Sequence, residues 1–247
     1  MPDMPEESSD IPQPVLEKIF SQIRQVFTEH PPTIGVIGVS GTGKSSVINT
    51  LFGTRLDISH TKACTKDFMA IELEVIGKKA KKEGKKTTLR VFDAPGLGED
   101  IERDPNYLEM YHKYLPQCDV ILYLISARNR AIALDQKYIQ ELKAYSNKML
   151  FAISQVDLVE PCDWANLSPI PSQSQDDNIQ EIIKDREPRI SKIVEQDVKL
   201  IPFSSYRGYN LEVLFNNILS TCKDDRAWLF DVIKSFSYED FLPSNIQ

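Results

Sequence analysis

Residues 33–52 constrain the fold of this 247-residue chain more than any other stretch. They begin with an apolar, β-branched run from Ile34 to Val39 and continue into a glycine-bearing segment. Apolar residues then recur at helical spacing, at Val47, Ile48, Leu51 and Phe52. Four residues separate Gly38 from the triplet Gly43-Lys44-Ser45, which is the spacing of a phosphate-binding loop. The stretch therefore predicts a strand, a phosphate-binding loop and a helix in that order.

Each residue type in this loop has a physical task. Glycines let the backbone turn so that its N–H groups converge on a phosphate, and the helix that starts near Lys44 adds the positive end of its dipole. The Lys44 ammonium would reach the β and γ phosphates, and the Ser45 hydroxyl would complete the ligand shell of a Mg²⁺ ion. The same string also occurs by chance in ordinary turns, but the flanking strand and amphipathic helix favour the functional interpretation.

A second nucleotide signature is Asp93-Ala94-Pro95-Gly96, directly after the predicted strand at 87–92. An aspartate at the carboxyl end of a strand would hold Mg²⁺ through a water molecule, and the Gly96 N–H would contact the γ-phosphate. The tetrapeptide would also suit a surface turn. Its place after a strand, downstream of Lys44, favours the nucleotide site.

Strands and helices alternate along the rest of the chain. Further strands are expected at 68–76, 119–125, 149–153 and 198–203. Helices are expected at 105–115, 134–146, 179–194 and 211–219, with a kink or break at Pro188. Residues 160–177, rich in Pro, Ser, Asp and Gln, are expected to form a long polar loop. This alternation predicts a three-layer α/β fold with a mostly parallel central sheet, and ligands that bind at the carboxyl ends of the strands.

Two amphipathic segments flank this region. The first carries an apolar stripe from Val15 to Phe27 and ends at Pro31-Pro32, and the second contains Trp228, Leu229, Val232, Ile233 and Phe236. We expect both helices to pack on the domain, near each other, with membrane or partner docking as the alternative for the first. The expected division is a disordered start and helix at 1–32, a nucleotide-binding domain at 33–222 and a helical extension at 223–247.

Composition narrows the functional class. The net charge of −7 argues against a general nucleic-acid coat. The lysine-rich stretch 77–86 is expected to be a solvated hairpin tip, with contact to anionic lipid, RNA or an acidic partner as the alternative. Four widely separated cysteines argue against a zinc site or disulfide framework. The first residues lack the layout of a signal peptide, and no stretch approaches the roughly 18 apolar residues of a membrane-spanning helix, so we expect a cytoplasmic location.

Taken together, these residues resemble the small GTPases of the translation-factor class, most closely the Era-like group, with relatives among immunity-related and dynamin-like GTPases. The resemblance covers about residues 33–220. Five elements carry it in the family's order: GVSGTGKSS at 38–46, Cys64-Thr65-Lys66-Asp67 as the first switch, DAPG at 93–96 as the start of the second switch, SQVD at 154–157, and Ser204-Ser205. The last two stand where the family usually has Asn-Lys-x-Asp and Ser-Ala.

This resemblance implies a three-layer G domain that binds GTP and GDP with Mg²⁺, hydrolyses GTP and acts as a conformational switch. Nucleotide contacts are implied for Ser40, Gly41, Thr42, Gly43, Lys44, Ser45, Ser46, Gln155, Asp157, Ser204 and Ser205. Implied Mg²⁺ ligands are Ser45, Thr65 and Asp93, with Thr61 close to the assigned threonine. Implied catalytic residues are Lys44, Thr65 and Gly96. A homodimer or an activating partner is a candidate source of further groups, there is no strong nucleic-acid signal, and peripheral membrane contact stays open.

The chain departs from the family pattern at the base-recognition element. Ser154 replaces the usual Asn and Gln155 replaces the usual Lys, so Gln155 could lay its aliphatic stem along the base but contributes no cation. Asp157 is retained, and its carboxylate would accept hydrogen bonds from guanine N1–H and the N2 amino group, a donor pair that adenine lacks. Guanine preference is therefore expected, with an ATPase as the rival to be tested.

A second departure concerns hydrolysis. Leu97 follows Gly96 where Ras-like enzymes carry a glutamine that orients water, and a leucine cannot hydrogen-bond water. Intrinsic hydrolysis should then be slow, or should use a group from elsewhere, such as Arg103, Arg128 or Arg130 in cis or across a dimer. A GTP-binding scaffold that hydrolyses little is the alternative. Gly41 stands where potassium-assisted members carry an asparagine, which argues against potassium dependence.

Overall fold

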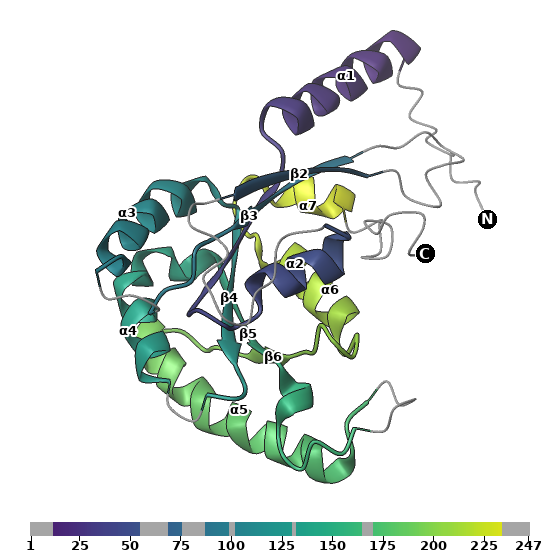
Figure 1. The fold of residues 1–247 in the computed structure, drawn as a ribbon. Helices are drawn as coiled ribbons and strands as arrows, with labels where there is room; N and C mark the ends of the chain where they lie inside the picture. The colour runs from purple at the N-terminus through teal and green to yellow at the C-terminus, as the bar shows by residue number, and fades with distance from the viewer. Residues whose placement is uncertain are drawn as a thin grey trace, which may run out of the picture. The chain divides into compact units, whose positions relative to one another are not determined.

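The computed structural model describes residues 12–54, 69–75, 87–98, 102–129, 132–164 and 170–233. These residues form a six-stranded sheet with strand order β2-β3-β1-β4-β5-β6 (Figure 1). The strands are β1 (Thr33–Gly38), β2 (Met69–Val75), β3 (Thr87–Asp93), β4 (Val120–Ser126), β5 (Met149–Ser154) and β6 (Leu200–Pro202). β2 runs antiparallel to β3, and each remaining pair of neighbours is parallel. The predicted mostly parallel α/β sheet is confirmed.

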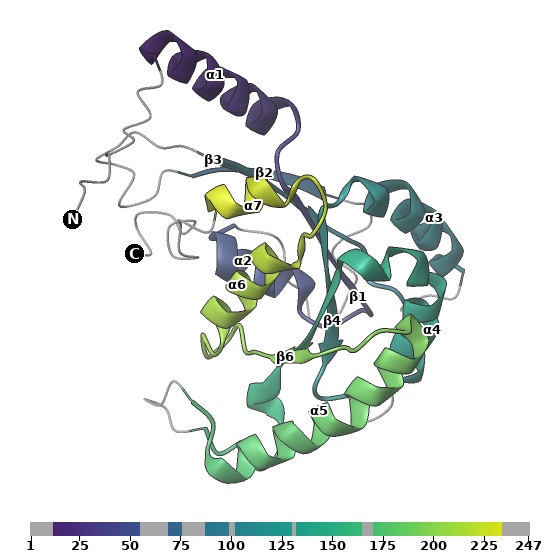
Figure 2. The same cartoon turned by 180° about the vertical axis from the view of Figure 1, so that it is seen from behind.

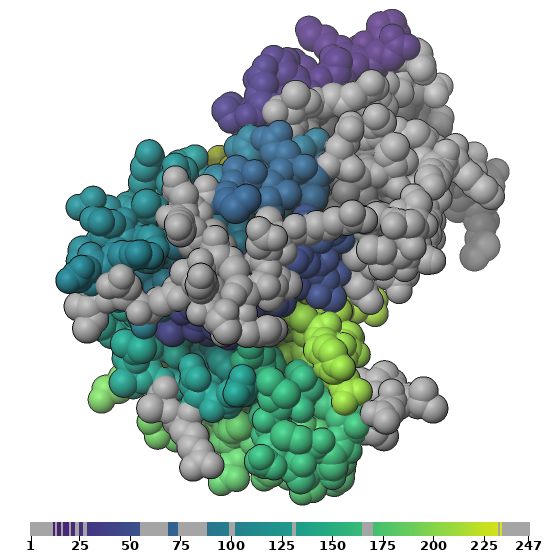
Figure 3. All heavy atoms as spheres, viewed as in Figure 1, coloured from purple at the N-terminus to yellow at the C-terminus, as the bar shows by residue number. Residues whose placement is uncertain are grey.

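Helices cover both faces of this sheet (Figures 1 and 2). One layer contains α2 (Lys44–Phe52), α6 (Leu211–Thr221) and α7 (Ala227–Ile233), and the other contains α3 (Asp104–Tyr114), α4 (Ala133–Glu141) and α5 (Gln173–Val194). In the space-filling view, the teal residues of α3 and α4 lie on one side of the molecule and the yellow-green residues of α6 on the other (Figure 3). The three-layer arrangement follows from strands that are apolar on both faces.

β4 shows how the sequence produces this arrangement. All seven of its residues are buried. Ile121, Tyr123 and Ile125 belong to the core cluster that also contains residues of α3, α4 and α5. Because successive side chains of a strand point to opposite faces, the residues between them face the layer of α2 and α6. A near-continuous apolar run is therefore what this central position requires.

The prediction for residues 160–177 is wrong at its carboxyl end, because α5 begins at Gln173. The Ser172 hydroxyl caps the helix by accepting a hydrogen bond from the Gln175 N–H at 3.1 Å. The Gln175 side chain is fully buried and donates to the carbonyl oxygens of Val159 and Asp157 at 2.8 and 3.2 Å. The polar composition of this stretch therefore does not indicate the start of α5, because its polar side chains find their hydrogen-bond partners inside the protein.

Of the kink or break predicted at Pro188, the break is wrong, since α5 continues to Val194, and the kink stays a prediction. Ile183 and Arg186 are buried before the proline, and Ile190 and Val194 are buried after it. The same helix face therefore packs on both sides of Pro188. This packing offsets the hydrogen bond that a proline cannot donate.

α7 is joined to the sheet by an ion pair at its start. Arg226 Nε donates to Asp119 Oδ1 at 2.5 Å, and Asp119 Oδ2 accepts from the Thr33 N–H at 2.8 Å. Leu229, Phe230 and Ile233 are fully buried, whereas Trp228 is 40% exposed. The prediction that Trp228 belongs to the buried apolar face is therefore wrong, and Phe230 is buried instead. Phe236 lies outside the described residues.

α1 (Gln13–Glu29) lies in a separate compact unit, residues 1–31, and the remaining chain from residue 32 forms the second unit. The helix spans the predicted stripe and ends before Pro31-Pro32. Its packing partner and the boundaries of the three expected segments stay predictions. None of the helices in the described ranges has the length and apolarity that crossing a bilayer requires. The lysine-rich stretch 77–86 lies outside those ranges.

Candidate nucleotide-binding site

The loop between β1 and α2 depends on glycine at two positions. Gly38 has a φ of 145°, and a Cβ atom there would lie 2.5 Å from the Leu124 carbonyl oxygen. Gly43 precedes α2 with a φ of 86°, in the left-handed region. Both conformations are easily adopted only by glycine. The requirement for glycine at positions 38 and 43 of the loop therefore has a direct steric cause.

Lys44, the first residue of α2, is folded back over this loop. Its Nζ atom donates to the carbonyl oxygens of Gly38 and Val39 at 3.2 and 3.1 Å, and the residue is only 8% exposed. The ammonium is thus held against the loop, at the amino end of a helix. Both features favour an anion at this place.

Ser45 and Asp93 meet although they are far apart in the sequence. The Ser45 hydroxyl donates to Asp93 Oδ2 at 2.8 Å, and Asp93 is 1% exposed at the carboxyl end of β3. Within the described ranges, no group of three or more His, Cys, Asp or Glu side chains could hold a metal ion. A hydroxyl and one carboxylate suit Mg²⁺, which keeps several waters and binds phosphate oxygens, better than a metal with an all-protein shell. The chemistry of these donors fits the predicted Mg²⁺ site.

The segment after Asp93 lies directly on the phosphate-binding loop. A Cβ atom at Gly96 would meet the Ser40 Cα atom at 2.7 Å, so only glycine permits this approach. The Ser40 N–H donates to the Leu97 carbonyl oxygen at 2.8 Å, and Val39 and Leu97 form a parallel bridge. The Leu97 side chain is fully buried in the core cluster. The side chain at position 97 therefore contributes to the packing of the core.

α3 and α4 hold the same segment from its other side. The Tyr111 hydroxyl donates to the Pro95 carbonyl oxygen at 2.6 Å, and the Gly98 N–H donates to Asp104 Oδ1 at 2.9 Å. The second carboxylate oxygen of Asp104 accepts from the Tyr138 hydroxyl. Thr65, the predicted ligand from the first switch, lies outside the described residues.

The end of β5 braces the phosphate-binding loop. The Ser154 hydroxyl donates to the Thr42 carbonyl oxygen at 2.7 Å, and Gln155 Nε2 donates to the Gly41 carbonyl oxygen at 3.0 Å. Gln155 has a φ of 61°, and its Oε1 atom accepts from the Ser126 hydroxyl at 2.6 Å. Ser154 and Gln155 stand where the family usually has Asn and Lys. Their uncharged side chains hold the phosphate-binding loop by hydrogen bonds. Whether the stem of Gln155 also touches a base stays a prediction.

Asp157 is fixed in orientation by its neighbours. The Ser204 hydroxyl donates to Asp157 Oδ1 at 2.6 Å and accepts from the Arg207 N–H at 3.0 Å. Since that hydroxyl accepts from the backbone and donates to the carboxylate, its direction is defined. The two base-recognition elements predicted from the sequence therefore lie together, joined by a hydrogen bond.

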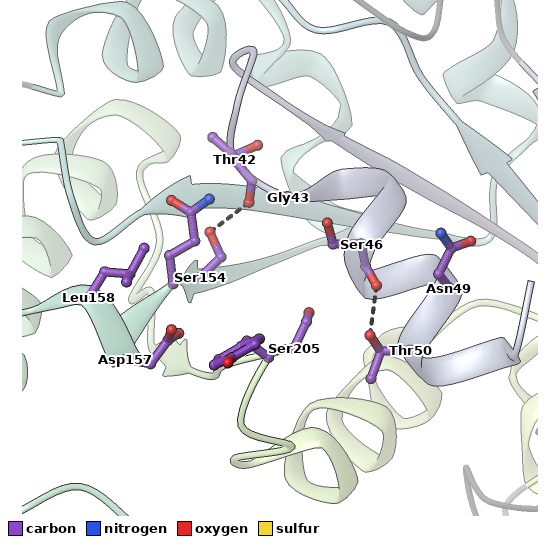
Figure 4. A pocket seen from close by; sticks show the side chains of 11 residues that line it. Thr42, Gly43, Ser46, Asn49, Thr50, Ser154, Asp157, Leu158 and Ser205 are labelled. Carbon is purple, nitrogen blue, oxygen red and sulfur yellow. Dashed lines mark hydrogen bonds between the residues drawn. The ribbon is translucent and has the colours of Figure 1, made fainter. Parts of the chain in front are cut away.

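A pocket of about 510 Å³ opens between these elements and α2 (Figure 4). The predicted nucleotide residues that line it are Thr42, Gly43, Ser46, Gln155, Asp157 and Ser205. Figure 4 shows Asp157 and Ser205 across the pocket from Ser46 and Thr50 of α2, with Ser154 directed at Thr42. Ser40 and Gly41 belong to the adjoining loop, Lys44 and Ser45 begin α2, and Ser204 is joined to Asp157 by its hydrogen bond. Apart from Thr65, the predicted site residues are brought together.

Sequence reasoning missed several residues of this site. Asn49, Thr50, Leu158 and Tyr206 also line the pocket, and Ser126 orients Gln155. Ser126 could have been found, because it ends β4 directly beside Ser154 at the end of β5. Arg103 and Arg128 do not line the pocket; Arg128 lies instead on a neighbouring groove that includes Arg186, and Arg130 is outside the described ranges.

Arg186 binds the end of β4 and the segment after it, and Asp135 binds Tyr123 within β4. The buried Arg186 guanidinium donates to the carbonyl oxygens of Ser126 and Ala127 at 2.9 and 3.4 Å. Asp135 is 1% exposed and accepts from the Tyr123 hydroxyl at 3.4 Å. Burial raises the pKa of Asp135 to about 6, although the Tyr123 hydrogen bond and the positive charges of Arg186 and Lys44 oppose the shift.

This shift predicts a pH-dependent stability. Between about pH 4 and pH 6 the folded protein holds a proton on Asp135 that the unfolded chain, with a carboxyl pKa of about 3.9, has released. The free energy of unfolding should therefore fall as the pH rises through this window, by about 2–3 kcal/mol from this group. Asp135→Asn keeps an acceptor for Tyr123 and should lack this component of the slope. Urea unfolding of both proteins from pH 4 to 7 measures the difference, and parallel stability curves would contradict it.

The fold and the site together define a class of protein. A parallel strand, a glycine loop and a helix hold a lysine over the loop, a serine and an aspartate lie at its edge, and a second carboxylate faces the pocket. This combination is a P-loop nucleotide-binding domain.

Comparison with known proteins identifies the family. Residues 33–155 match the family described as "50S ribosome-binding GTPase", so this part of the chain belongs to that family of P-loop GTPases. Uncharacterized protein YfjP of Escherichia coli K12 is 38% identical over 162 residues, which are 64% of this chain and 53% of that protein. GTPase Era of Aquifex aeolicus is 26% identical over 190 residues, 75% of this chain and 55% of that protein. The chain thus spans about half the length of these relatives.

A solved structure confirms the fold. Aquifex aeolicus Era bound to GDP and AlF4⁻ superposes with a TM-score of 0.56 at 23% identity, over 78% of this chain and 57% of that one. The expected resemblance to Era-like GTPases is confirmed.

Proposed function

We propose that this chain binds GTP together with Mg²⁺ and hydrolyses it to GDP and phosphate. The observation that carries the proposal is the Ser45–Asp93 hydrogen bond of 2.8 Å beside the loop that Lys44 covers. Two oxygen donors of the kind that Mg²⁺ binds are thus in contact with each other, next to a helix end and a lysine that would favour a phosphate. When bound, Mg²⁺ would neutralise charge on the β and γ phosphates.

In this proposal the chain's residues act by positioning and by charge. Lys44 exchanges its loop carbonyls for phosphate oxygens, while the N–H groups of Ser40 to Ser46 surround the phosphates. Ser45 and Asp93 hold the metal, with Thr65 as a further proposed ligand from the first switch. Gly96 places its N–H near the γ-phosphate, and Asp157 reads the guanine edge. Water attacks the γ-phosphorus in line with the leaving oxygen.

Hydrolysis by the isolated chain is expected to be slow. Leu97 is buried, so its side chain cannot orient the attacking water. The rate should be on the order of 10⁻⁴ to 10⁻² per second, as in GTPases that await a group from a partner. Single-turnover phosphate release from GTP, with protein in excess and at several protein concentrations, measures it. A rate per molecule that rises with concentration would indicate that a second copy supplies the group.

The same experiment separates the enzyme from its rivals. No phosphate release above that of a Lys44→Ala control, together with tight GTP binding, would favour a GTP-binding scaffold. Side-by-side titration with GDP and ADP tests the ATPase alternative, because Asp157 should select guanine. We further propose that the chain acts as a conformational switch, since the segment 95–98 is hydrogen-bonded both to the phosphate-binding loop and to α3. We also propose the cytoplasmic location expected from the sequence.

A further inference from the structure

The loop after β6 presents an exposed aromatic side chain on a firmly held backbone. Tyr206 is 84% exposed. Ser204 and Tyr209 at the two ends of the loop form an antiparallel bridge with reciprocal N–H to carbonyl bonds of 3.1 Å. The Tyr209 ring packs edge-on against Trp164 with a centroid distance of 5.2 Å. The position of Tyr206 is therefore fixed by the loop, although its own side chain has little covering it.

Tyr206 also lies at the pocket. It lines the same 510 Å³ pocket as Asp157 and Ser205, and Leu158, which is 46% exposed, lines it too. The carboxylate proposed to read the base is thus accompanied by two apolar surfaces that face the pocket. Apolar walls around a few polar groups are what small-molecule pockets use to bind a flat ligand.

One neighbour restrains the ring. The Arg207 guanidinium lies over the Tyr206 ring, 5.4 Å from its centroid. A cation at this distance is attracted to the aromatic face. Arg207 itself is held through its N–H, which donates to the Ser204 hydroxyl at 3.0 Å, and that hydroxyl also binds Asp157. The Tyr206 ring is therefore connected to the Asp157 carboxylate through Arg207 and Ser204.

We propose that Tyr206 stacks on the purine base of the bound nucleotide and forms the outer wall of its pocket. This inference rests on the proposed function, and it adds a binding residue at that site. A π-face stacks on any purine, so Tyr206 contributes affinity without choosing among purines. Asp157 makes that choice through hydrogen bonds to the base edge. In this proposal Tyr206 contributes affinity for the base, and Asp157 contributes the specificity for guanine.

The test compares Tyr206→Ala with Tyr206→Phe by calorimetric titration with GDP and with inosine diphosphate, which lacks the N2 amino group. Removal of one base–aromatic stack should weaken binding of both nucleotides by about tenfold. Their affinity ratio should be unchanged, and Tyr206→Phe should bind each within about twofold of the unsubstituted protein. Inorganic pyrophosphate, measured by competition, should bind all three proteins equally because it has no base.

Val213→Ala provides a matched surface control, since Val213 is 48% exposed on α6 and does not line the pocket. GDP binding that is unchanged in Tyr206→Ala would overturn the inference while leaving the proposed function intact. An equal loss of pyrophosphate affinity would also overturn it, because the substitution would then act on the phosphate-binding loop. Failure of the unsubstituted protein to bind GDP would instead refute the proposed function, and the inference with it.

Discussion

Lys44→Ala is expected to lower the affinity for GDP and GTP by about 100-fold or more. The ammonium would make at least two charge-assisted hydrogen bonds to phosphate, each worth about 1.5–3 kcal/mol. The Lys44 Nζ atom donates to the Gly38 and Val39 carbonyl oxygens, which holds the ammonium at the loop where the phosphates are proposed to bind. Titration with fluorescently labelled GDP measures the loss.

The fold should survive this substitution because the loop has other attachments. Ser154 binds the Thr42 carbonyl oxygen, Gln155 binds the Gly41 carbonyl oxygen, and the Ser40 N–H binds Leu97. The melting temperature should therefore change little. Lys192→Ala on α5 makes the same change of charge at an exposed position and should bind GDP normally. Undiminished GDP affinity in Lys44→Ala would refute the assignment of the nucleotide site.

The parts of the fold that were predictable are those that local sequence determines. The strand before Gly38, the helix after Lys44 and the apolar run of β4 follow from periodicity and burial on both faces. The start of α5 was not predictable in this way, because Ser172 and Gln175 are polar and their role depends on partners near residue 157. Pro188 was misleading for a similar reason, since packing on both sides of it offsets a local preference.

The candidate site likewise contains residues that local sequence predicts and residues whose role depends on tertiary contacts. Glycine spacing predicted the phosphate-binding loop, a strand end predicted Asp93, and the resemblance to Era-like GTPases implied Asp157. The hydrogen bond from Ser154 to Thr42 joins residues 112 positions apart, so no local sequence pattern predicts it. The burial of Leu97 likewise depends on the bridge to Val39, and a leucine could not by itself indicate which way it faces. Residues that act through tertiary contacts are therefore the ones that a motif search misses.

Base recognition gives the second large effect, through Asp157→Asn. The Ser204 hydroxyl accepts from the Arg207 N–H and donates to Asp157 Oδ1, because an ionised carboxylate can only accept. An asparagine would keep its carbonyl oxygen toward Ser204 and would turn its NH₂ group toward the base. That NH₂ would then meet the N2 amino group of guanine, donor against donor. Each polar group left unpaired costs about 1–3 kcal/mol, so GDP affinity should fall at least about tenfold.

Xanthine carries a carbonyl oxygen where guanine carries the N2 amino group, and that oxygen can accept from the new amide. Xanthosine diphosphate should therefore bind Asp157→Asn better than GDP does, which reverses the order expected for the unsubstituted protein. Competition titrations of the two nucleotides on both proteins measure this reversal. Asp157→Ala is the matched control, because it removes the carboxylate without adding a donor and should weaken GDP binding without favouring xanthine. If the order does not reverse, Asp157 is not the group that reads the base, and the guanine preference must come from another part of the pocket.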